Sequence, residues 1–358
     1  AHFVTLSRYH FVTLPLCHFV TFAHSHFPTD FADHDGDARA MRALVFDQDL
    51  NFDPRWPAPQ PAPGECVIRV CQAGICSTDL QITRGYMGFR GVLGHEFVGI
   101  VEQGSHAWIN RRVACEINCV CGRCAMCQGG LGNHCPERTV LGIAGRDGAF
   151  ADRVVAPERN LHAIPDSISD EEAVFIEPLA AAWQVIQQVR IEPRMHVSVV
   201  GSGRLGLLIA QVLAGTGCRL DVVGRNLHTL DLCEKRHIRT LQVEKTPRRN
   251  DRDVVVECTG SPDGLAVALG LVRPRGTIVL KSTYAGDAAI DLAPAVVNEV
   301  NIVGSRCGPF GEAIAALERH DVDVRPMISR EFPLERGVEA LAAAADPRNV
   351  KVLLKINP

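Results

Sequence analysis

Cysteine thiolates are the clearest candidates for chemistry in this sequence, which has 358 residues and 14 cysteines. Four of them are spaced as Cys121-x2-Cys124-x2-Cys127-x7-Cys135. Four thiolates on one short segment are typical of a closed tetrahedral zinc site, which stabilises a loop and leaves no position for a substrate. An iron–sulfur cluster and redox-active thiols are the alternatives. Because a chain of this size needs no disulfide framework, we expect a structural zinc ion and a reducing, cytoplasmic location.

A second set of possible metal ligands is spread along the chain: Cys76, the pair His95-Glu96, and Glu177. Pro178 disfavours helix at the residue before it, so we expect a break at Glu177. Taken one at a time, these residues have ordinary structural roles as a buried thiol, a hydrogen-bonded histidine and carboxylates at the ends of elements. Spacing alone therefore favours structural roles over a second zinc site.

A glycine-rich turn predicts a nucleotide site. The apolar stretch 197–200 runs into G-x-G-x-x-G, and a helical stretch over 207–213 follows. A strand before the glycines and a helix after them make this motif specific. Gly201 permits the tight turn, Gly203 lets the backbone approach a pyrophosphate, and Gly206 lets the helix pack closely on the strand.

The next expected strand bears on which dinucleotide binds. An acid at its end would hold the ribose 2′-hydroxyl of NAD, but Gly224 stands there and Arg225 follows. A guanidinium without a neighbouring carboxylate suits a 2′-phosphate, so we expect NADP, with NAD as the alternative. Asp221 lies inside the strand, where we expect it to be out of reach. We also expect Arg204 and Leu205, within the glycine turn, to lie at the cofactor.

Two patterns of apolar residues organise the chain around these motifs. Residues 41–165 contain short strands and glycine turns, which predict a β domain. Between about 166 and 308, strands alternate with helical stretches after a capping box at Ser169-x-x-Glu172, which predicts a doubly wound parallel sheet. Residues 309–358 are too few for a third domain, so we expect them to complete the first. The expected strands are 66–71, 97–101, 112–115, 149–155, 197–200, 220–223, 254–257, 277–280 and 350–354, and the expected late helices are 311–319 and 335–345.

The first forty residues differ from the rest. His-Phe-Val-Thr occurs at 2–5, 10–13 and 18–21, a period too short for a solenoid, and the first methionine, Met41, opens a clean strand pattern. We interpret 1–40 as a non-native or disordered leader outside the fold. Its six histidines leave a metal-binding or partner-binding extension as the alternative.

Composition excludes several classes of protein. Hydrophobic residues make up 46% and charged residues 22%, which is ordinary for a globular chain and argues against disorder throughout. The sequence has no run of 18 apolar residues, so we expect no membrane-spanning helix. The net charge is -4 without a basic block, which disfavours nucleic acid as a partner.

The motifs occur in one fixed order: the Cys-Ser-Thr-Asp segment at 76–79, Gly-His-Glu at 94–96, the four-cysteine segment and the glycine fingerprint. In this order the chain resembles the zinc-containing alcohol dehydrogenases of the medium-chain dehydrogenase/reductase superfamily, over residues 41–358. The resemblance implies an α/β protein: a chaperonin-10-like β catalytic domain, completed by the C-terminal segment, plus a Rossmann domain. A catalytic zinc ion would lie in the cleft between them.

The resemblance also implies roles for single residues. Cys76 and His95 become ligands of the catalytic zinc, and Glu96 can serve as a further ligand. Asp79 matches the carboxylate that orients the histidine, and Thr78 matches the hydroxyl that relays the substrate proton. Cofactor contacts are implied for three residues in the second half of the chain: Thr259, Ser282 and Lys351.

Two positions set this chain apart from many relatives. Glu177-Pro178 stands where others carry a cysteine ligand, and is similar to the polyol, glucose and threonine dehydrogenase branch. In that branch the carboxylate binds zinc directly or holds its water, so Glu96 and Glu177 both stay candidates. Gln81 replaces a histidine that ends the proton relay in some relatives, and it accepts no proton at neutral pH.

These roles predict a reaction. Zinc in an open site acidifies a bound alcohol, Thr78 passes the proton outward, and the alcohol carbon gives hydride to the nicotinamide. We therefore expect a zinc-dependent, NADP-preferring alcohol or polyol dehydrogenase that acts on small alcohols or the matching carbonyls, as a homodimer or homotetramer like most relatives. The alternatives are an aldehyde reductase and a non-catalytic dinucleotide sensor, although a pure sensor needs no hydride-transfer site.

Overall fold

The computed structural model describes residues 40–283 and 289–357, so the expected leader lies outside the described residues except for Ala40. Within the described ranges, no helix has both the length and the apolar character needed to cross a membrane.

Short antiparallel strands build the part of the chain that carries Cys76 and His95. The elements are β1 (Ala40–Asp47), β2 (Asp49–Pro57), β3 (Glu65–Gly74), α1 (Ser77–Ile82), η1 (Tyr86–Gly88), β4 (Gly91–Val92), β5 (Glu96–Gln103), β6 (Arg112–Cys115), β7 (Asn118–Cys119), α2 (Ala125–Gln128), η2 (Gly132–His134), β8 (Thr139–Leu141), β9 (Gly145–Arg146), β10 (Arg153–Pro157), η3 (Glu158–Asn160) and β11 (Leu161–Ala163). β3 is central in a seven-stranded sheet, where β5, β10 and β19 all pair with it. Nearly all its side chains are buried, as its run of valine, isoleucine and cysteine requires.

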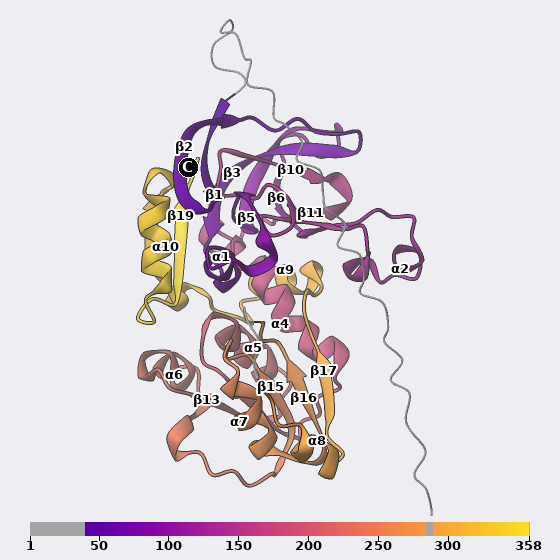
Figure 1. Ribbon diagram of the computed structural model, residues 1–358, viewed down its shortest axis with the longest axis vertical. Coiled ribbons are helices and arrows are strands. Elements are labelled where there is room, and N and C mark those ends of the chain that lie inside the picture. Colours follow the sequence, from indigo (N-terminus) through magenta and orange to yellow (C-terminus); the bar gives the residue numbers. More distant parts are fainter. Residues whose placement is uncertain (1–39, 284–288, 358) are drawn as a thin grey trace, which may run out of the picture. The chain divides into compact units, whose positions relative to one another are not determined.

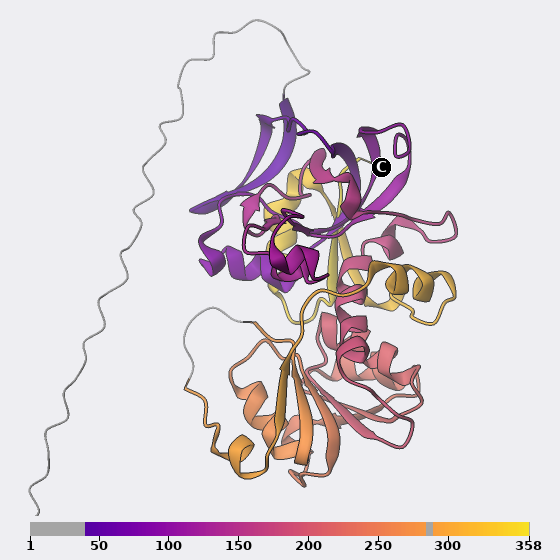
Figure 2. The ribbon, with the colours of Figure 1, turned by 90° about the vertical axis from the view of Figure 1, so that its right-hand side faces the viewer.

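The middle of the chain forms a six-stranded parallel sheet. Its elements are α3 (Asp170–Ala173), α4 (Ile176–Gln188), β12 (His196–Val200), α5 (Arg204–Ala214), β13 (Arg219–Gly224), α6 (Leu227–Glu234), β14 (Arg239–Gln242), η4 (Val243–Lys245), β15 (Arg252–Glu257), α7 (Asp263–Leu271), β16 (Val272–Leu280), α8 (Ala293–Val297) and β17 (Asn301–Gly304). The strand order is β14-β13-β12-β15-β16-β17. Val254 and Val256 belong to one apolar core and Val255 to another, because alternate residues of a strand face opposite sides. Helices therefore cover both faces (Figure 2).

The last segment returns to the β sheet. It contains α9 (Phe310–Glu318), η5 (Arg325–Met327), β18 (Ile328–Pro333), η6 (Leu334–Arg336), α10 (Gly337–Ala345) and β19 (Lys351–Lys355). β19 pairs antiparallel with β3, so that the last strand of the chain inserts beside one of the first. Figure 1 shows β19 and α10 next to the indigo strands β1 and β2. The fold class is thus the predicted one: a chaperonin-10-like β domain and a Rossmann-like parallel sheet.

Two expected elements differ in detail. Strand β10 begins at Arg153, whereas the prediction began at 149: residues 149 and 150 bond to the loop before His95 and to β1, and form no continuous ladder. The expected break at Glu177 is also wrong. Helix α3 ends at Ala173 and α4 begins at Ile176, one residue before Glu177, so Glu177 is helical. Pro178 is tolerated because N–H groups in the first turn of a helix have no intrahelical acceptor.

An ion pair ties the first described strand to the end of the chain. The Asp152 carboxylate accepts hydrogen bonds from Arg42 Nη2 (2.7 Å), Nε (3.0 Å) and the backbone N–H (2.8 Å). Arg42 also donates to the carbonyl of Ile356 and to Asn357. Burial opposes the charge of Asp152, but its hydrogen bonds and the charge of Arg42 outweigh burial and hold its pKa below the usual value.

We predict that Asp152→Asn lowers the free energy of unfolding at pH 7 by about 1–3 kcal/mol, measured by urea denaturation. Because the folded pKa is lowered, this stabilisation is present above the unfolded pKa of about 4 and is lost as the pH falls through the folded value. The difference between wild type and variant should therefore shrink between pH 5 and pH 3. Glu339→Gln, which breaks an exposed pair with Arg336, should change the free energy of unfolding much less than Asp152→Asn does. A difference for Asp152→Asn that is independent of pH would contradict this assignment.

Candidate active site

Cys76, His95 and Glu96 meet where β3 and β5 lie side by side. The two strands are antiparallel, with Gly74 opposite Glu96. The end of β3 therefore faces the start of β5, and Cys76, two residues beyond β3, comes to lie beside His95. The thiol, an imidazole nitrogen and a carboxylate oxygen of the three residues are within 4.8 Å of one another.

The local backbone on both sides of this group is closely specified. Cys76 is the N-cap of α1: its sulfur accepts from the N–H of Thr78 (3.4 Å), and its own N–H donates to the Asp79 carboxylate (2.8 Å). The turn before β5 needs glycine at position 94, where φ is 95° and a Cβ atom would lie 2.2 Å from the ring of Phe150. The cap of α1 and the tight contact at Gly94 thus fix the backbone positions from which the Cys76 and His95 side chains extend.

A buried carboxylate orients the histidine. The Asp79 and His95 side chains are 0% and 3% exposed, and Oδ1 of Asp79 lies 3.3 Å from Nδ1 of His95. Among the described residues neither atom has a hydrogen-bond partner. Burial disfavours the charged ring, but Asp79 and Cys76 outweigh it and raise the pKa of His95. A ring held at Nδ1 presents Nε2 as a ligand, and sulfur, nitrogen and oxygen donors are a set that zinc binds, so this group fits a zinc ion.

Lys351 forms a buried ion pair with Glu96. The two side chains are 2% and 3% exposed, and Nζ also lies 5.5 Å from the centre of the Phe175 ring. Gly74 leaves room for this lysine, because a Cβ atom there would be 2.6 Å from Lys351 Cε. The sequence predicted Lys351 as a cofactor contact. The structure places it in the cleft wall with its ammonium group on Glu96.

Glu177, in the first turn of α4, borders the same cleft but is not part of the three-residue ligand group. Burial raises the pKa of Glu177 to about 7 and repulsion from Glu96 adds to this effect, while His95 and Lys351 act in the opposite direction. Its carboxyl group therefore differs from the ion-paired carboxylate of Glu96.

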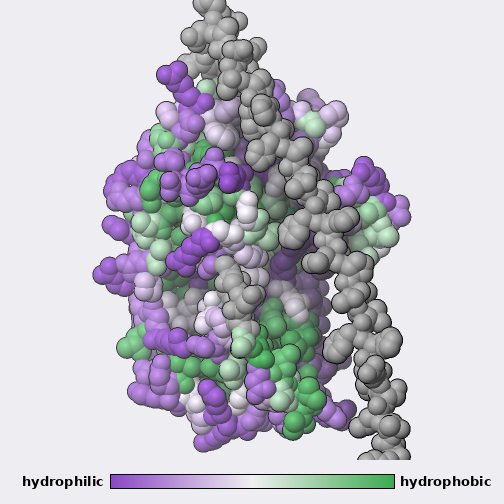
Figure 3. Space-filling model, viewed as in Figure 1, coloured by the Kyte–Doolittle hydropathy of each residue, from purple (hydrophilic) through white to green (hydrophobic). Residues whose placement is uncertain are grey.

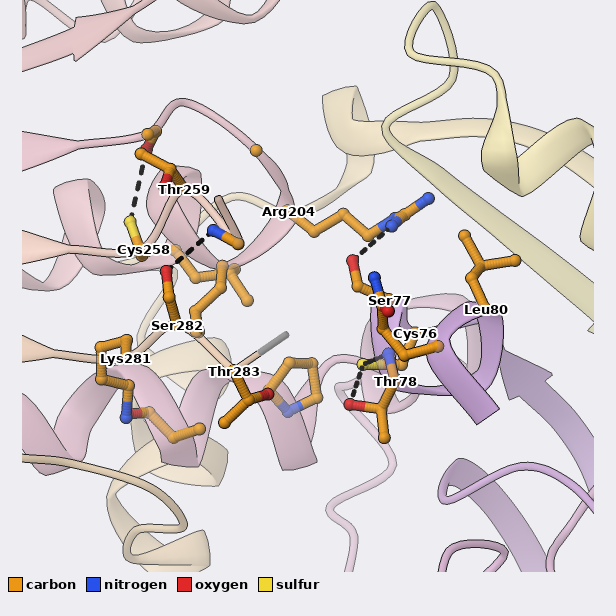
Figure 4. A pocket seen from close by; sticks show the side chains of 18 of the residues that line it. Cys76, Ser77, Thr78, Leu80, Arg204, Cys258, Thr259, Lys281, Ser282 and Thr283 are labelled. Atoms are coloured by element: carbon orange, nitrogen blue, oxygen red, sulfur yellow. Dashed lines mark hydrogen bonds between the residues drawn. The ribbon is translucent and has the colours of Figure 1, made fainter. Parts of the chain in front are cut away.

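One cleft of about 990 Å³ is lined by the predicted cofactor-binding residues except Gly206. Cys76, Thr78 and Gln81 line one wall, and Gly201 and Gly203 line the other. The hydroxyl of Thr78 lies 3.6 Å from the sulfur of Cys76, as Figure 4 shows.

The glycine turn has the geometry that a dinucleotide requires. Gly201 has a φ of 110°, and a Cβ atom at Gly206 would be 1.9 Å from the carbonyl oxygen of Gly201. Gly203 has open space around it and is the N-cap of α5, without a side-chain cap. The N–H groups at Arg204 and Leu205 are thus available to an anion at the start of an 11-residue helix.

The side chain of Arg204 has a role that the sequence did not reveal. It crosses the cleft and donates to the hydroxyl of Ser77 (2.7 Å) and to the carbonyls of Val350 (2.6 Å) and Ala344. Figure 4 shows it pointing at Ser77, next to Cys76. Nothing in the sequence places residues 77, 344 and 350 near 204, so only the fold could show this contact.

The end of β13 has no acidic side chain facing the cleft. A Cβ atom at Gly224 would lie 2.3 Å from the hydroxyl of Ser202, which bonds to Thr229 (2.7 Å). Arg225 is exposed and lines the cleft. Asp221 is fully buried, and its carboxylate is held inside the sheet. Its partners are His196, Ser198 and Arg252.

A buried carboxylate organises the loop after β15. Oε1 of Glu257 accepts from the hydroxyl (2.6 Å) and N–H (2.8 Å) of Thr259 and from the hydroxyl of Ser282 (3.0 Å), which in turn accepts from the N–H of Gly260. Thr259 and Ser282, both predicted cofactor contacts, thus lie together in the cleft wall. Sequence analysis missed Glu257, although its place at the end of a strand was a signal.

The four-cysteine segment folds into a separate small lobe with α2 and η2. The sulfur atoms of Cys121, Cys124, Cys127 and Cys135 are within 4.8 Å of one another. The Cys124–Cys127 and Cys121–Cys127 sulfur pairs are 3.5 and 4.0 Å apart, too long for disulfides. Backbone N–H groups lower the pKa of Cys121 to about 7. Four converging thiols suit a tetrahedral zinc ion.

Comparisons with known proteins agree with this geometry. Residues 62–166 match the alcohol dehydrogenase GroES-like domain, and residues 205–320 match the zinc-binding dehydrogenase family. Sorbitol dehydrogenase of Halalkalibacterium halodurans is 29% identical over 322 residues, or 83% of this chain and 93% of the relative. D-arabitol-phosphate dehydrogenase of Enterococcus avium is 27% identical, over 84% and 92%.

Solved structures of 26% identity are also similar. A short chain alcohol dehydrogenase from Escherichia coli CFT073, complexed with NADH, has a TM-score of 0.81 and covers 89% of this chain and 100% of its own. A zinc-binding dehydrogenase from Sinorhizobium meliloti 1021, bound to NADP, has a TM-score of 0.80, over 88% and 99%. The chain therefore belongs to the zinc-containing alcohol dehydrogenase family of the medium-chain dehydrogenase/reductase superfamily and is an oxidoreductase of alcohols.

Proposed function

We propose that the protein oxidises a polyol, or reduces the matching carbonyl compound, with one zinc ion at Cys76 and His95 and with NADP as the hydride carrier. The observation that carries this proposal is that the ligand group and the glycine turn line one cleft, so that a substrate at the metal would adjoin a bound dinucleotide. Relatives named sorbitol and D-arabitol-phosphate dehydrogenases support a polyol.

Each residue of the site has a distinct task in this proposal. Cys76, His95 and Glu96 would hold the metal, and the grouping of Glu96 with the other two favours it over Glu177 as the carboxylate ligand. When bound, zinc supplies Lewis acidity at the substrate oxygen, and the nicotinamide takes up the hydride. Asp79 would hold the His95 ring, and the Thr78 hydroxyl would relay the substrate proton, accepting it while donating its own proton to solvent in the cleft.

NADP is favoured by what surrounds the end of β13. Gly224 and Ser202 leave no carboxylate for a ribose 2′-hydroxyl, and Asp221 is engaged inside the sheet. Arg225 is exposed, lines the cleft and forms no ion pair among the described residues. Its planar guanidinium group suits the doubly charged 2′-phosphate.

The second zinc ion in this proposal is structural and belongs to the four-cysteine lobe. All cysteines of the described residues are free thiols, which supports a reducing compartment such as the cytoplasm.

We predict two zinc atoms per chain by mass-spectrometric metal analysis. Cys76→Ala should retain one zinc, lose turnover and keep nearly the wild-type melting temperature, because its site lies in an open cleft. Cys127→Ala should also retain one zinc but should melt at a lower temperature, because its metal holds a loop together. Cys119→Ala is the matched control and should retain two. Two zinc atoms in the Cys76 variant would contradict the catalytic site.

We predict that Arg225→Ala raises the Michaelis constant for NADPH by about 10- to 100-fold, since it removes a charge-assisted hydrogen bond to the 2′-phosphate. The constant for NADH should change less than about 3-fold. Arg219→Ala, at the opposite end of β13 and outside the cleft lining, serves as the control. Equal effects on both nucleotides would refute the phosphate assignment.

We also propose a homodimer through β17. This strand is at the edge of the parallel sheet, and apolar side chains beside it are exposed, among them Val296 (76%) and Val297 (79%). Figure 3 shows hydrophobic residues gathered over this region. An exposed edge strand next to an apolar patch favours pairing with a second copy. We predict a dimer in sedimentation velocity and a monomer for Val297→Glu; a monomeric wild type at micromolar concentration would contradict the proposal.

A further inference from the structure

Five arginines line the cleft and none forms an ion pair among the described residues; two of them, Arg138 and Arg306, bond to the segments around the four-cysteine lobe. Arg138 and Arg306 both line the cleft, and neither forms an ion pair with any carboxylate in the described parts of the chain. Most other arginines of the structure do, including the buried Arg252, which pairs with Asp221 and Asp251. Arg138 is half-buried and Arg306 is exposed, so both guanidinium groups are accessible to an anion that enters the cleft.

The hydrogen bonds of both guanidinium groups are incomplete. Nη1 of Arg138 donates to the carbonyl of Cys135 (3.1 Å), but its Nε is buried and has no partner among the described residues. Arg306 donates through Nη2 alone, to the side-chain oxygen of Asn118 (3.1 Å) and the carbonyl of Asn133 (2.7 Å). Each group therefore keeps free donors for a ligand.

Strands β7 and β8 relate the positions of the two arginines. Asn118 lies on β7, opposite Val140 of β8, and it binds Arg306 directly. Arg138 precedes Val140 by two residues, which in an extended chain puts its side chain on the same face as that of Val140. Asn118, Val140, Arg138 and Arg306 all line the cleft.

This basic pair adjoins the proposed reaction centre. The amide of Asn118 also donates to the sulfur of Cys307 (3.3 Å), and Cys307 is close enough to Glu177 to be influenced by its charge. Three other cations of the cleft, Lys351, Lys281 and Arg204, are already engaged, whereas Arg84 and Arg225 are exposed and form no ion pair among the described residues. Lys351 pairs with Glu96, and Lys281 donates to the carbonyls of Ala181 and Arg306 at 2.8 Å.

We propose that the substrate is an anionic polyol, with a carboxylate or phosphate bound by Arg138 and Arg306 beside Asn118 and its reacting hydroxyl group at Cys76 and His95. Guanidinium groups bind both anions through paired, charge-assisted hydrogen bonds. This inference rests on the proposed dehydrogenase function and narrows its substrate class.

The test is a matched panel of three substrates with one carbon skeleton: a pentitol, the corresponding pentonate and the pentitol phosphate. Each is oxidised by the zinc-loaded protein with NADP or NAD, and kcat/KM is measured from the reduced nicotinamide absorbance. At least one anionic member should exceed the neutral pentitol by 10-fold or more, and comparing the two anions identifies which group is bound.

Substitutions locate the effect. Arg138→Gln and Arg306→Gln should each raise KM for the preferred anion by about 10- to 100-fold with little change in kcat, and change KM for the neutral pentitol less than about 3-fold. Arg138→Lys and Arg306→Lys retain the charge and should recover part of the affinity, which separates anion binding from a folding defect. Arg190→Gln removes an arginine that is 86% exposed and outside the cleft, and should behave as wild type.

The possible results distinguish a failure of the anionic-substrate inference from a failure of the proposed dehydrogenase function. Turnover of the neutral pentitol at least as efficient as that of both anions would overturn the anionic class and leave the dehydrogenase function standing. Equal KM effects of the glutamine variants on charged and neutral substrates would also overturn it. Failure to oxidise any member with either nucleotide would refute the proposed polyol dehydrogenase function, and this inference with it.

Discussion

The antiparallel register of β3 and β5 is the constraint on which the site depends. It sets Gly74 opposite Glu96 and thereby brings a thiol from one strand end next to an imidazole and a carboxylate from the start of the other. A shift by one residue would turn every side chain of β5 to the opposite face of the sheet. Glycines at 74 and 94 are required here for space, since larger residues would meet Lys351 and Phe150.

The C-terminal segment supplies the positive charge that pairs with Glu96 in this group. β19 carries Lys351 to Glu96, two residues that are 255 positions apart, and a buried carboxylate without this partner would be strongly destabilised. Arg204 makes a second link, from the start of α5 to Ser77 and to carbonyls just before β19. The proposed metal ligands, the glycine turn and the C-terminal segment are thus joined by direct hydrogen bonds, so the parts that would meet around a substrate are held together.

Features with a local signal could be predicted from the sequence. The four-cysteine spacing, the glycine fingerprint, the capping box at Ser169 and four of the six strands of the parallel sheet, all except β14 and β17, depend on residues close together in the chain. The helical state of Glu177 was missed because a proline rule was applied without the first-turn exception. Contacts of Lys351, Arg204 and Arg306 could not be predicted, because each depends on which distant segments pack together.

Anomalous X-ray scattering at the zinc absorption edge, from crystals grown with zinc and NADP, tests directly whether Cys76 and His95 bind one zinc ion beside the nucleotide. We predict a zinc peak about 2.3 Å from the sulfur of Cys76 and about 2.0–2.1 Å from a ring nitrogen of His95, facing the nicotinamide. A peak at the four-cysteine lobe alone, with no metal between residues 76 and 95, would contradict this prediction.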